Sequence, residues 1–158
     1  MSDNYSHIVF HDDIEQGTEQ WLKVRSNMLS GTDAVKVRTG TPRDEILQKK
    51  AEAPHYSNHA MERGHVLEDF AIDIYSRIHE CQVGRSGYIT NDKYPGCMHS
   101  PDGFVISTHR RLLEVKAFNG DRHINNAELV EPIIVDQIAW GMMIGEFTLC
   151  IYLLTLCE

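Results

Sequence analysis

Asp102, Glu114 and Lys116 are the residues of this chain whose types and spacing suit a catalytic metal site. Asp102 follows Pro101, and Glu114 and Lys116 stand two positions apart in the next apolar run. Carboxylate oxygens with open coordination positions suit Mg²⁺, with Mn²⁺ as a substitute, because these ions keep waters and bind phosphate. Such an ion lowers the pKa of a bound water, and an amine such as Lys116 can orient that water. The three residues therefore predict metal-dependent cleavage of a phosphodiester bond.

The apolar run at residues 112–118 predicts the buried strand that positions two of these groups. Side chains alternate between the faces of a strand, so Glu114 and Lys116 share one face and their apolar neighbours point to the other. Residues 102–107 predict an adjacent strand, which carries Asp102. Burying unpaired charge is costly, so we expect a metal, a partner charge or a water-filled cleft beside these groups.

A tryptophan and an arginine precede a hydroxyl-rich helix start near the N-terminus. Trp21 and Arg25 lie four positions apart, and Ser30 and Thr32 follow at the start of a short helix. This set suits an anion, because a guanidinium binds phosphate bidentately and a helix N-terminus presents free N–H groups. The sequence leaves a second interpretation open, with Trp21 in the core, Arg25 on the surface and Ser30 or Thr32 as a helix cap.

Glu68 belongs to a long helix predicted over residues 58–79. Apolar residues at helical spacing predict one stripe that faces the core, made of Leu67, Phe70, Ala71, Ile74 and Ile78. Glu68 borders that stripe, whereas its neighbour Asp69 is expected to face solvent. Glu68 therefore either reaches the metal site, directly or through water, or pairs with Arg63 or Lys116 as an ordinary helix-edge carboxylate.

Gln137 is the polar member of an otherwise apolar helix face. Pro132 begins the predicted helix and Gly145 stops it. The face consists of Ile133, Ile134, Gln137, Ile138 and Gly141. A polar group in this position needs a partner. The sequence leaves open whether Gln137 faces a catalytic cleft or bonds backbone groups in the core.

Pro101-Asp102 followed by Glu114-Val115-Lys116 resembles the signature of the PD-(D/E)xK nuclease superfamily. With the three segments above, residues 16–152 resemble the lambda-exonuclease family, also called the YqaJ-like viral recombinases. The resemblance implies an α/β fold of restriction-endonuclease type, with an α-β-β-β-α-β core whose mixed central sheet is flanked by helices. Strands are expected near residues 82–90, 102–107, 112–118 and 147–156, the last as a central strand covered on both faces.

The resemblance also implies a role for each site residue. The implied metal ligands are Asp102, Glu114, the Val115 carbonyl and Glu68. Lys116 is implied to position the nucleophilic water, and Gln137 to hold either that water or Lys116. The implied pocket for a terminal 5′ phosphate consists of Arg25, Ser30 and Thr32.

The activity implied by the resemblance is that of a Mg²⁺-dependent exonuclease of phage-type recombination. It would digest one strand of duplex DNA from the 5′ end and leave a 3′ single strand for a single-strand-annealing partner protein. A homo-oligomer, a trimer by resemblance, is expected, but the further C-terminal segments of lambda-type exonucleases have no counterpart here, which puts processivity in doubt. Two alternatives remain: an endonuclease of the same superfamily, of restriction or junction-resolving type, and a non-catalytic DNA- or protein-binding member.

The composition predicts a single domain over residues 1–158 with an irregular segment at 1–15. The apolar runs are too short to span a bilayer and the N-terminus has no secretory apolar region, so we expect a cytoplasmic protein without membrane contact. The cysteines lack C-x-x-C spacing, which argues against a zinc or iron–sulfur site. His99 is expected as a hydrogen-bonded histidine at a strand end rather than a metal ligand.

The net charge of −8 opposes nucleic-acid binding, which rests largely on Lys and Arg. Metal-site carboxylates account for part of this charge. The candidates for a local basic track are Lys36, Arg38, Lys49, Lys50, Arg110, Arg111 and Arg122. We therefore expect weaker or more salt-sensitive DNA binding than a basic nuclease shows.

Overall fold

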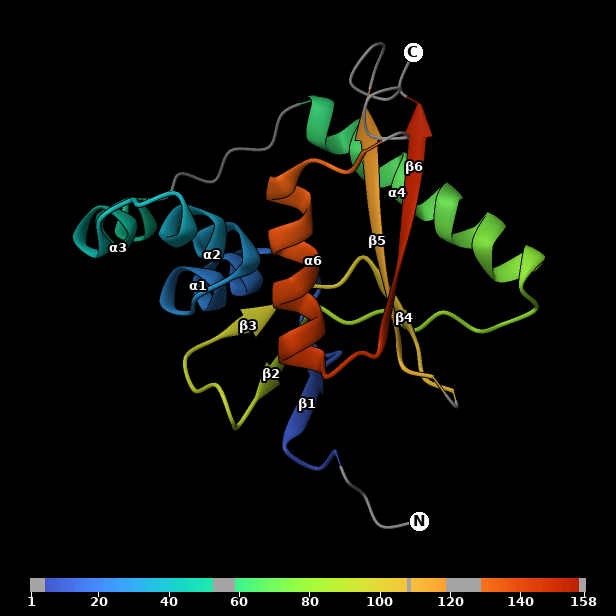
Figure 1. Ribbon diagram of the computed structural model, residues 1–158, viewed down its shortest axis with the longest axis horizontal. Coiled ribbons are helices and arrows are strands. Elements are labelled where there is room, and N and C mark those ends of the chain that lie inside the picture. Colours follow the sequence, from blue (N-terminus) through green and yellow to red (C-terminus); the bar gives the residue numbers. More distant parts are fainter. Residues whose placement is uncertain (1–4, 53–58, 108, 119–128, 157–158) are drawn as a thin grey trace.

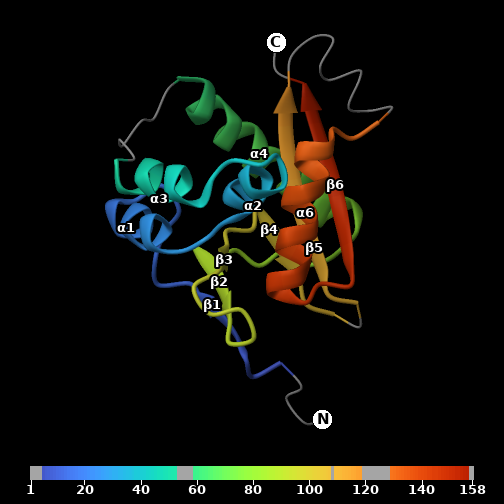
Figure 2. The same ribbon diagram turned by 60° about the vertical axis from the view of Figure 1, so that its left-hand side comes forward.

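The computed structural model describes residues 5–52, 59–107, 109–118 and 129–156, with the backbone alone for 59–65 and 154–156. Its elements in chain order are β1 (Ile8–His11), α1 (Glu19–Asn27), α2 (Gly31–Arg38), α3 (Arg43–Ala51), α4 (His59–Ile78), β2 (Tyr88–Asn91), β3 (Met98–His99), β4 (Gly103–Val105), β5 (Arg111–Phe118), α6 (Pro132–Gly145) and β6 (Leu149–Leu156). In Figures 1 and 2 the three short helices α1, α2 and α3 lie together, and α2 packs against α6.

A mixed sheet of β4, β5 and β6 carries the predicted metal site (Figure 1). β4 pairs antiparallel with β5, with Gly103 opposite Leu113, and β5 pairs parallel with β6. The central strand is therefore β5. The prediction that residues 147–156 form the central strand is wrong, because β5 is the single neighbour of β6 among the described strands. Both α4 and α6 contact β6, which explains its apolar residues on both faces.

The helices α4 and α6 cover opposite faces of this sheet. Leu112 belongs to a buried cluster with Ile144 of α6. Its neighbour Leu113 instead packs with Tyr75 of α4. Adjacent strand residues point to opposite faces, so the two helices lie on opposite sides of β5, as the two ribbon views show (Figures 1 and 2).

A second, antiparallel sheet consists of β1, β2 and β3. The sequence predicted an irregular N-terminal segment, and residues 8–11 correct that prediction because they pair with β2. The strand expected near residues 82–90 is also shorter, since β2 begins at Tyr88. Before it, Gly84 forms an isolated bridge with Phe104, whose ring lies so close that a Cβ on Gly84 would meet it at 2.4 Å. Both differences from the predicted strands depend on contacts between residues that lie far apart in the sequence.

The helix ends differ in how they are capped. Thr18 caps α1, and its Oγ1 accepts the Trp21 N–H at 3.3 Å. The sequence from Thr41 to Asp44 resembles a capping box, but α3 has Pro42 at its N-cap and no side-chain cap. Gly145 remains helical, and Glu146 ends α6 with a left-handed φ of 47°. His7 and Lys93 bind the Glu146 carboxylate at 2.8 and 2.6 Å and hold it there.

The buried face of α4 differs from the predicted stripe. Ala71, Ile72 and Tyr75 are buried against the sheet, whereas Phe70 and Ile78 are 60% and 70% exposed. Apolar residues lie on two neighbouring faces of this helix, so spacing alone did not identify the buried one. None of the described helices is long and apolar enough to span a membrane.

Candidate functional site

The end of β4 creates the central feature of the site. β4 begins at Gly103, opposite Leu113, so β5 continues past Leu113 without a β4 partner. Asp102 takes that place, because its Oδ2 accepts the Val115 N–H at 2.6 Å. The N–H and C=O of one strand residue point to the same side, so the Val115 carbonyl faces this edge as well. One carboxylate and one carbonyl oxygen therefore meet where the sheet opens.

Glu114 and Lys116 share a face of β5, as strand alternation predicts. Lys116 Nζ binds Glu114 Oε1 at 2.5 Å and donates to the Val115 carbonyl at 3.3 Å. Glu114 is only 5% exposed. Its carboxylate is thus held out of water with the ammonium group as its partner, and burial of a charge requires such a partner. The ammonium group and the Asp102 carboxylate therefore both bind the backbone of Val115.

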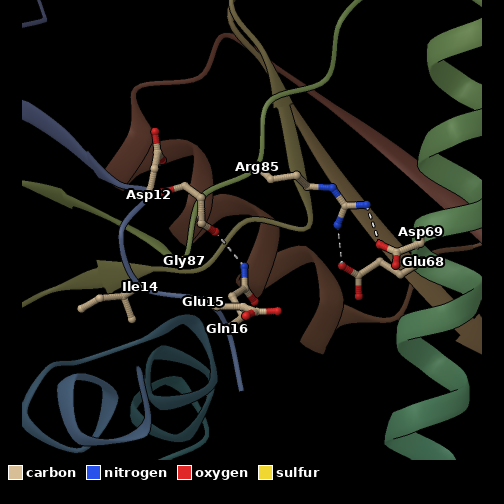
Figure 3. A pocket seen from close by; sticks show the side chains of 9 residues that line it. Asp12, Ile14, Glu15, Gln16, Glu68, Asp69, Arg85 and Gly87 are labelled. Carbon is tan, nitrogen blue, oxygen red and sulfur yellow. Dashed lines mark hydrogen bonds and ion pairs between the residues drawn. The ribbon is translucent and has the colours of Figure 1, made fainter. Parts of the chain in front are cut away.

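Glu68 joins this group from α4. Its carboxylate accepts from Arg85 at 3.5 Å, and Arg85 also binds Asp69 at 2.7 Å (Figure 3). The charges of Glu114 and Lys116 both act on the pKa of Glu68, so the three side chains lie in one electrostatic neighbourhood. Asp69 is exposed, as predicted. Arg85, which the sequence did not single out, pairs with Glu68, whereas the side chain of the predicted partner Arg63 lies outside the described residues.

Burial raises the pKa of all three carboxyl groups. The pKa of Glu114 rises to about 7 through burial and then the negative charge of Asp102, against the effect of Lys116. The pKa of Asp102 rises to about 6, mainly through burial, although Lys116 opposes this. The pKa of Glu68 also rises to about 6 through burial, against the effect of Arg85. The cluster has more negative charge than its own cations neutralise, and an added cation would relieve this.

The donor set fits Mg²⁺ or Mn²⁺. Among the described residues, no group of three or more His, Cys, Asp or Glu side chains is arranged so that it could hold a metal ion. Asp102, Glu114 and the Val115 carbonyl instead supply two carboxylates and one neutral oxygen, with Glu68 nearby. Mg²⁺ is commonly bound through one or two carboxylates while waters and substrate phosphates fill its other positions. These oxygens therefore suit a hard divalent ion that stays open to substrate.

Arg25 and Thr32 of the predicted phosphate pocket come together. Arg25 donates to Thr32 Oγ1 at 3.2 Å, and its guanidinium lies 4.9 Å from the centre of the Trp21 ring. Trp21 Nε1 donates to the Ser100 hydroxyl at 3.0 Å, so this group is tied to the segment that leads to Asp102. Both the exposed Thr32 hydroxyl and the Arg25 fork can meet an anion.

Ser30 is placed differently from the other two. It is 4% exposed, and its hydroxyl donates to Asp33 Oδ2 at 2.8 Å, while its N–H binds the same oxygen at 3.0 Å. Lys50 Nζ approaches that oxygen at 2.7 Å. The hydroxyl of Ser30 thus stabilises the start of α2, which is the capping interpretation. Ser30 nevertheless lies only two positions before Thr32.

Gln137 lies against the start of α2. A Cβ on Gly31 would lie 3.5 Å from the Gln137 Cα and 3.7 Å from its Cβ. Lys116, one of the two implied partners of Gln137, bonds Glu114 and the Val115 carbonyl. Gln137 is half-buried in this position.

The comparisons with known proteins identify the family of the chain. Residues 20–144 match the model of the YqaJ-like viral recombinase domain. The chain belongs to this family. No curated protein matches it. The match covers Arg25, Glu68, Asp102, Glu114 and Lys116, so the residues just described lie within the YqaJ-like domain.

Solved structures show the same fold as this YqaJ-like domain. LHK-Exo in complex with dAMP is 26% identical, with a TM-score of 0.74 over 87% of this chain and 73% of that chain. A structure of the alkaline exonuclease LHK-Exo from Laribacter hongkongensis, at 24% identity, has a TM-score of 0.73 over 88% and 74%. The predicted fold class is confirmed. Family and likeness together support a nuclease of the phage-recombination type.

The environment of His99 in this YqaJ-like domain differs from the prediction. His99 is buried at the end of β3, but its Nε2 has no hydrogen-bond partner among the described residues. Burial, followed by the positive charges of Lys116 and Arg25, lowers its pKa to about 4. The charges of Lys116 and Arg25 therefore both reach the His99 ring. Its position directly before Ser100-Pro101-Asp102 was the available sequence signal.

The predicted basic track of this YqaJ-like domain is largely paired within the chain. Arg38 binds Asp136, Lys49 binds Glu45, and Lys36 and Lys50 bind Asp33. Arg110 is buried and donates to the carbonyls of Gly145 and Glu146 at 2.7 and 3.3 Å, so its assignment to the track is wrong. Arg122 lies outside the described residues.

Proposed function

We propose that this chain is a Mg²⁺-dependent deoxyribonuclease that digests duplex DNA from its ends in the 5′→3′ direction during phage-type recombination. The observation that carries the proposal is the meeting of Asp102, Glu114 and Lys116 at the point where β4 ends and β5 continues. A 3′ single strand would remain for a single-strand-annealing protein. The kind of DNA end and the annealing partner come from the family resemblance.

The residues divide the chemistry as follows. Asp102, Glu114 and the Val115 carbonyl would hold the ion, with Glu68 directly or through water. When bound, the ion polarises the phosphodiester and lowers the pKa of a water. Lys116, fixed by Glu114 and the Val115 carbonyl, orients that water and offsets charge on the attacked phosphate. Water attacks in line, without a covalent enzyme intermediate.

The end of the substrate is recognised by a separate group. Arg25 and Thr32 would bind the terminal 5′ phosphate, because their donors lie together beside the N-terminus of α2. Burial lowers the pKa of Arg25, which shows that its guanidinium is partly removed from water, while Asp33 opposes that shift. A charge-assisted bond gains strength in such surroundings.

Digestion of a linear duplex with a labelled, 5′-phosphorylated end tests the proposal. We expect Mg²⁺-dependent loss of the 5′-phosphorylated strand, no cleavage in EDTA, and no cleavage of covalently closed circles. Lys116→Ala should be inactive, while Lys93→Ala, which removes an exposed lysine paired with Glu146, should stay active. Cleavage of circles would instead assign the chain to the endonuclease branch. DNA binding without cleavage under every condition would favour a binding protein.

A further inference from the structure

A cavity of about 610 Å³ is lined by Glu68, one of the proposed metal-site carboxylates, on the side of α4 (Figure 3). Four of its lining residues are acidic, namely Asp12, Glu15, Glu68 and Asp69. Arg85 is the cation among the described lining residues. The volume falls within the range of small-molecule sites, so a nucleotide unit fits inside it.

The wall of this cavity is tied to the segment that carries Asp102. Gln16 Nε2 donates to the Ser86 carbonyl at 3.0 Å and to the Pro101 carbonyl at 2.9 Å. Trp21 Nε1 donates to the Gly87 carbonyl at 3.0 Å. These bonds fix the wall relative to Asp102 before any ligand arrives. Such a preorganised wall loses little freedom on binding.

Arg85 is the residue in this cavity that is free to change partners. Its side chain is 45% exposed, and the Asp69 side chain that it binds at 2.7 Å is 72% exposed. Its contact with Glu68 is longer, at 3.5 Å. Exposed ion pairs contribute little, roughly 0–1 kcal/mol, because water screens both charges. A phosphate, which an arginine binds through two parallel N–H groups, can therefore displace Asp69.

The charges of the cavity make such a contact necessary for DNA. A phosphodiester brought next to Glu68 faces carboxylates on several sides, and like charges repel. Lys116 is already held by Glu114 and the Val115 carbonyl on β5. Arg85 supplies the compensating positive charge on the α4 side. Its negative partner Asp69 keeps it at the cavity when no DNA is bound.

We propose that Arg85 binds a phosphate of the strand being cut within this cavity. In the absence of DNA, the ion pair with Asp69 keeps the guanidinium at the cavity. The proposal rests on the nuclease function above, but it assigns a contact distinct from the terminal-phosphate group of Arg25 and Thr32. Arg85 acts as a positioning residue, because it holds the strand beside the metal site without taking part in bond cleavage.

Equilibrium binding of a fluorescent 5′-phosphorylated duplex tests this inference, with Lys116→Ala as the parent so that the DNA stays intact. We expect Arg85→Gln to weaken binding about tenfold and to lower the slope of log K against log salt by about 1. Arg85→Lys should recover part of the affinity. Asp69→Asn should bind on the order of two- to fivefold more tightly, because the competing ion pair is gone.

Arg77→Gln is the matched control, because it removes an exposed arginine paired with an aspartate on the same helix, Asp73. Binding and salt slope should match the parent. Equal binding by Arg85→Gln and Arg77→Gln would overturn the inference and leave the nuclease proposal intact. A lower melting temperature of Arg85→Gln with unchanged binding would show a purely structural role. Both proposals would be overturned if Lys116→Ala failed to bind DNA and the unsubstituted protein failed to cut it.

Discussion

Asp102 replaces the strand partner that Val115 lacks, because its Oδ2 accepts the Val115 N–H at 2.6 Å where β4 has ended. The same carboxylate thus completes the backbone hydrogen bonds of β5 and supplies a metal ligand to the proposed site. Removal of the charge and removal of the hydrogen bond can be separated by two substitutions.

Asp102→Asn should fold and yet lose cleavage by about 100-fold or more, because the amide oxygen still accepts the Val115 N–H while the charged ligand is gone. Asp102→Ala should lose cleavage too and unfold more easily than Asp102→Asn by roughly 1–3 kcal/mol, since it leaves a buried N–H unpaired. Urea unfolding in EDTA and a Mg²⁺-dependent cleavage assay measure the two effects. Equal stability of the two variants would show that the hydrogen bond is unimportant for folding.

Glu114 should make the metal-free protein less stable as the pH rises. Its pKa in the folded chain is about 7, above the ordinary value of 4.5, so folding favours the protonated form. The stability it contributes is complete below pH 4.5 and is lost as the pH rises through 7. In EDTA we therefore expect Glu114→Gln, which mimics the protonated form, to gain roughly 1–3 kcal/mol relative to the parent between pH 5 and pH 8.

The difference between variant and parent is the quantity to measure in that experiment. His99 has a lowered pKa of about 4, so its contribution is lost as the pH falls and opposes the trend of Glu114. His99 is present in both proteins and cancels in the difference. Mg²⁺ should stabilise the parent more at pH 8 than at pH 5, and should stabilise Glu114→Gln less. Parallel pH profiles for the two proteins would contradict the prediction.

The parts of the site that follow from local sequence were predictable. Alternation along β5 placed Glu114 and Lys116 together, and the polar residues before α1 and α2 indicated where those helices begin. The cap also explains Ser30, whose two interpretations the sequence could not separate. Its hydroxyl binds Asp33, only three positions away, and either use of the hydroxyl satisfies the same local pattern.

The remaining features depend on contacts between distant segments. β1 forms because β2 pairs with it, across about eighty positions of sequence, and four residues alone carry little strand signal. Arg85 meets Glu68 and Asp69 because the turn after α4 returns past the helix. The exposed Phe70 and Ile78 show the same limit, since helical spacing gives an apolar face but not what covers it.

Arg25 and Ser30 should differ in their effects on the DNA end. Arg25→Gln should reduce the preference for a 5′-phosphorylated over a 5′-hydroxyl end, because it removes the charged fork beside Thr32. Ser30→Ala should keep that preference and lose about 1 kcal/mol of stability, because its hydroxyl supports the start of α2. Initial rates on the two kinds of end measure the preference. Loss of end preference in Ser30→Ala would show that the Ser30 hydroxyl does bind the terminal phosphate.

The His99 ring should leave no room for a side chain at position 141. A Cβ at position 141 would lie 2.5 Å from His99 Nε2 and 2.9 Å from Leu112 Cδ2, inside a packed core. Gly141→Ala should therefore cost roughly 1–3 kcal/mol of unfolding free energy, since α6 and β3 must move apart. Adding His99→Ala removes the imidazole from that space, so the same substitution at Gly141 should cost less in the second background. If the cost is the same in both backgrounds, the collision with Leu112 or the helix backbone limits position 141, and His99 does not.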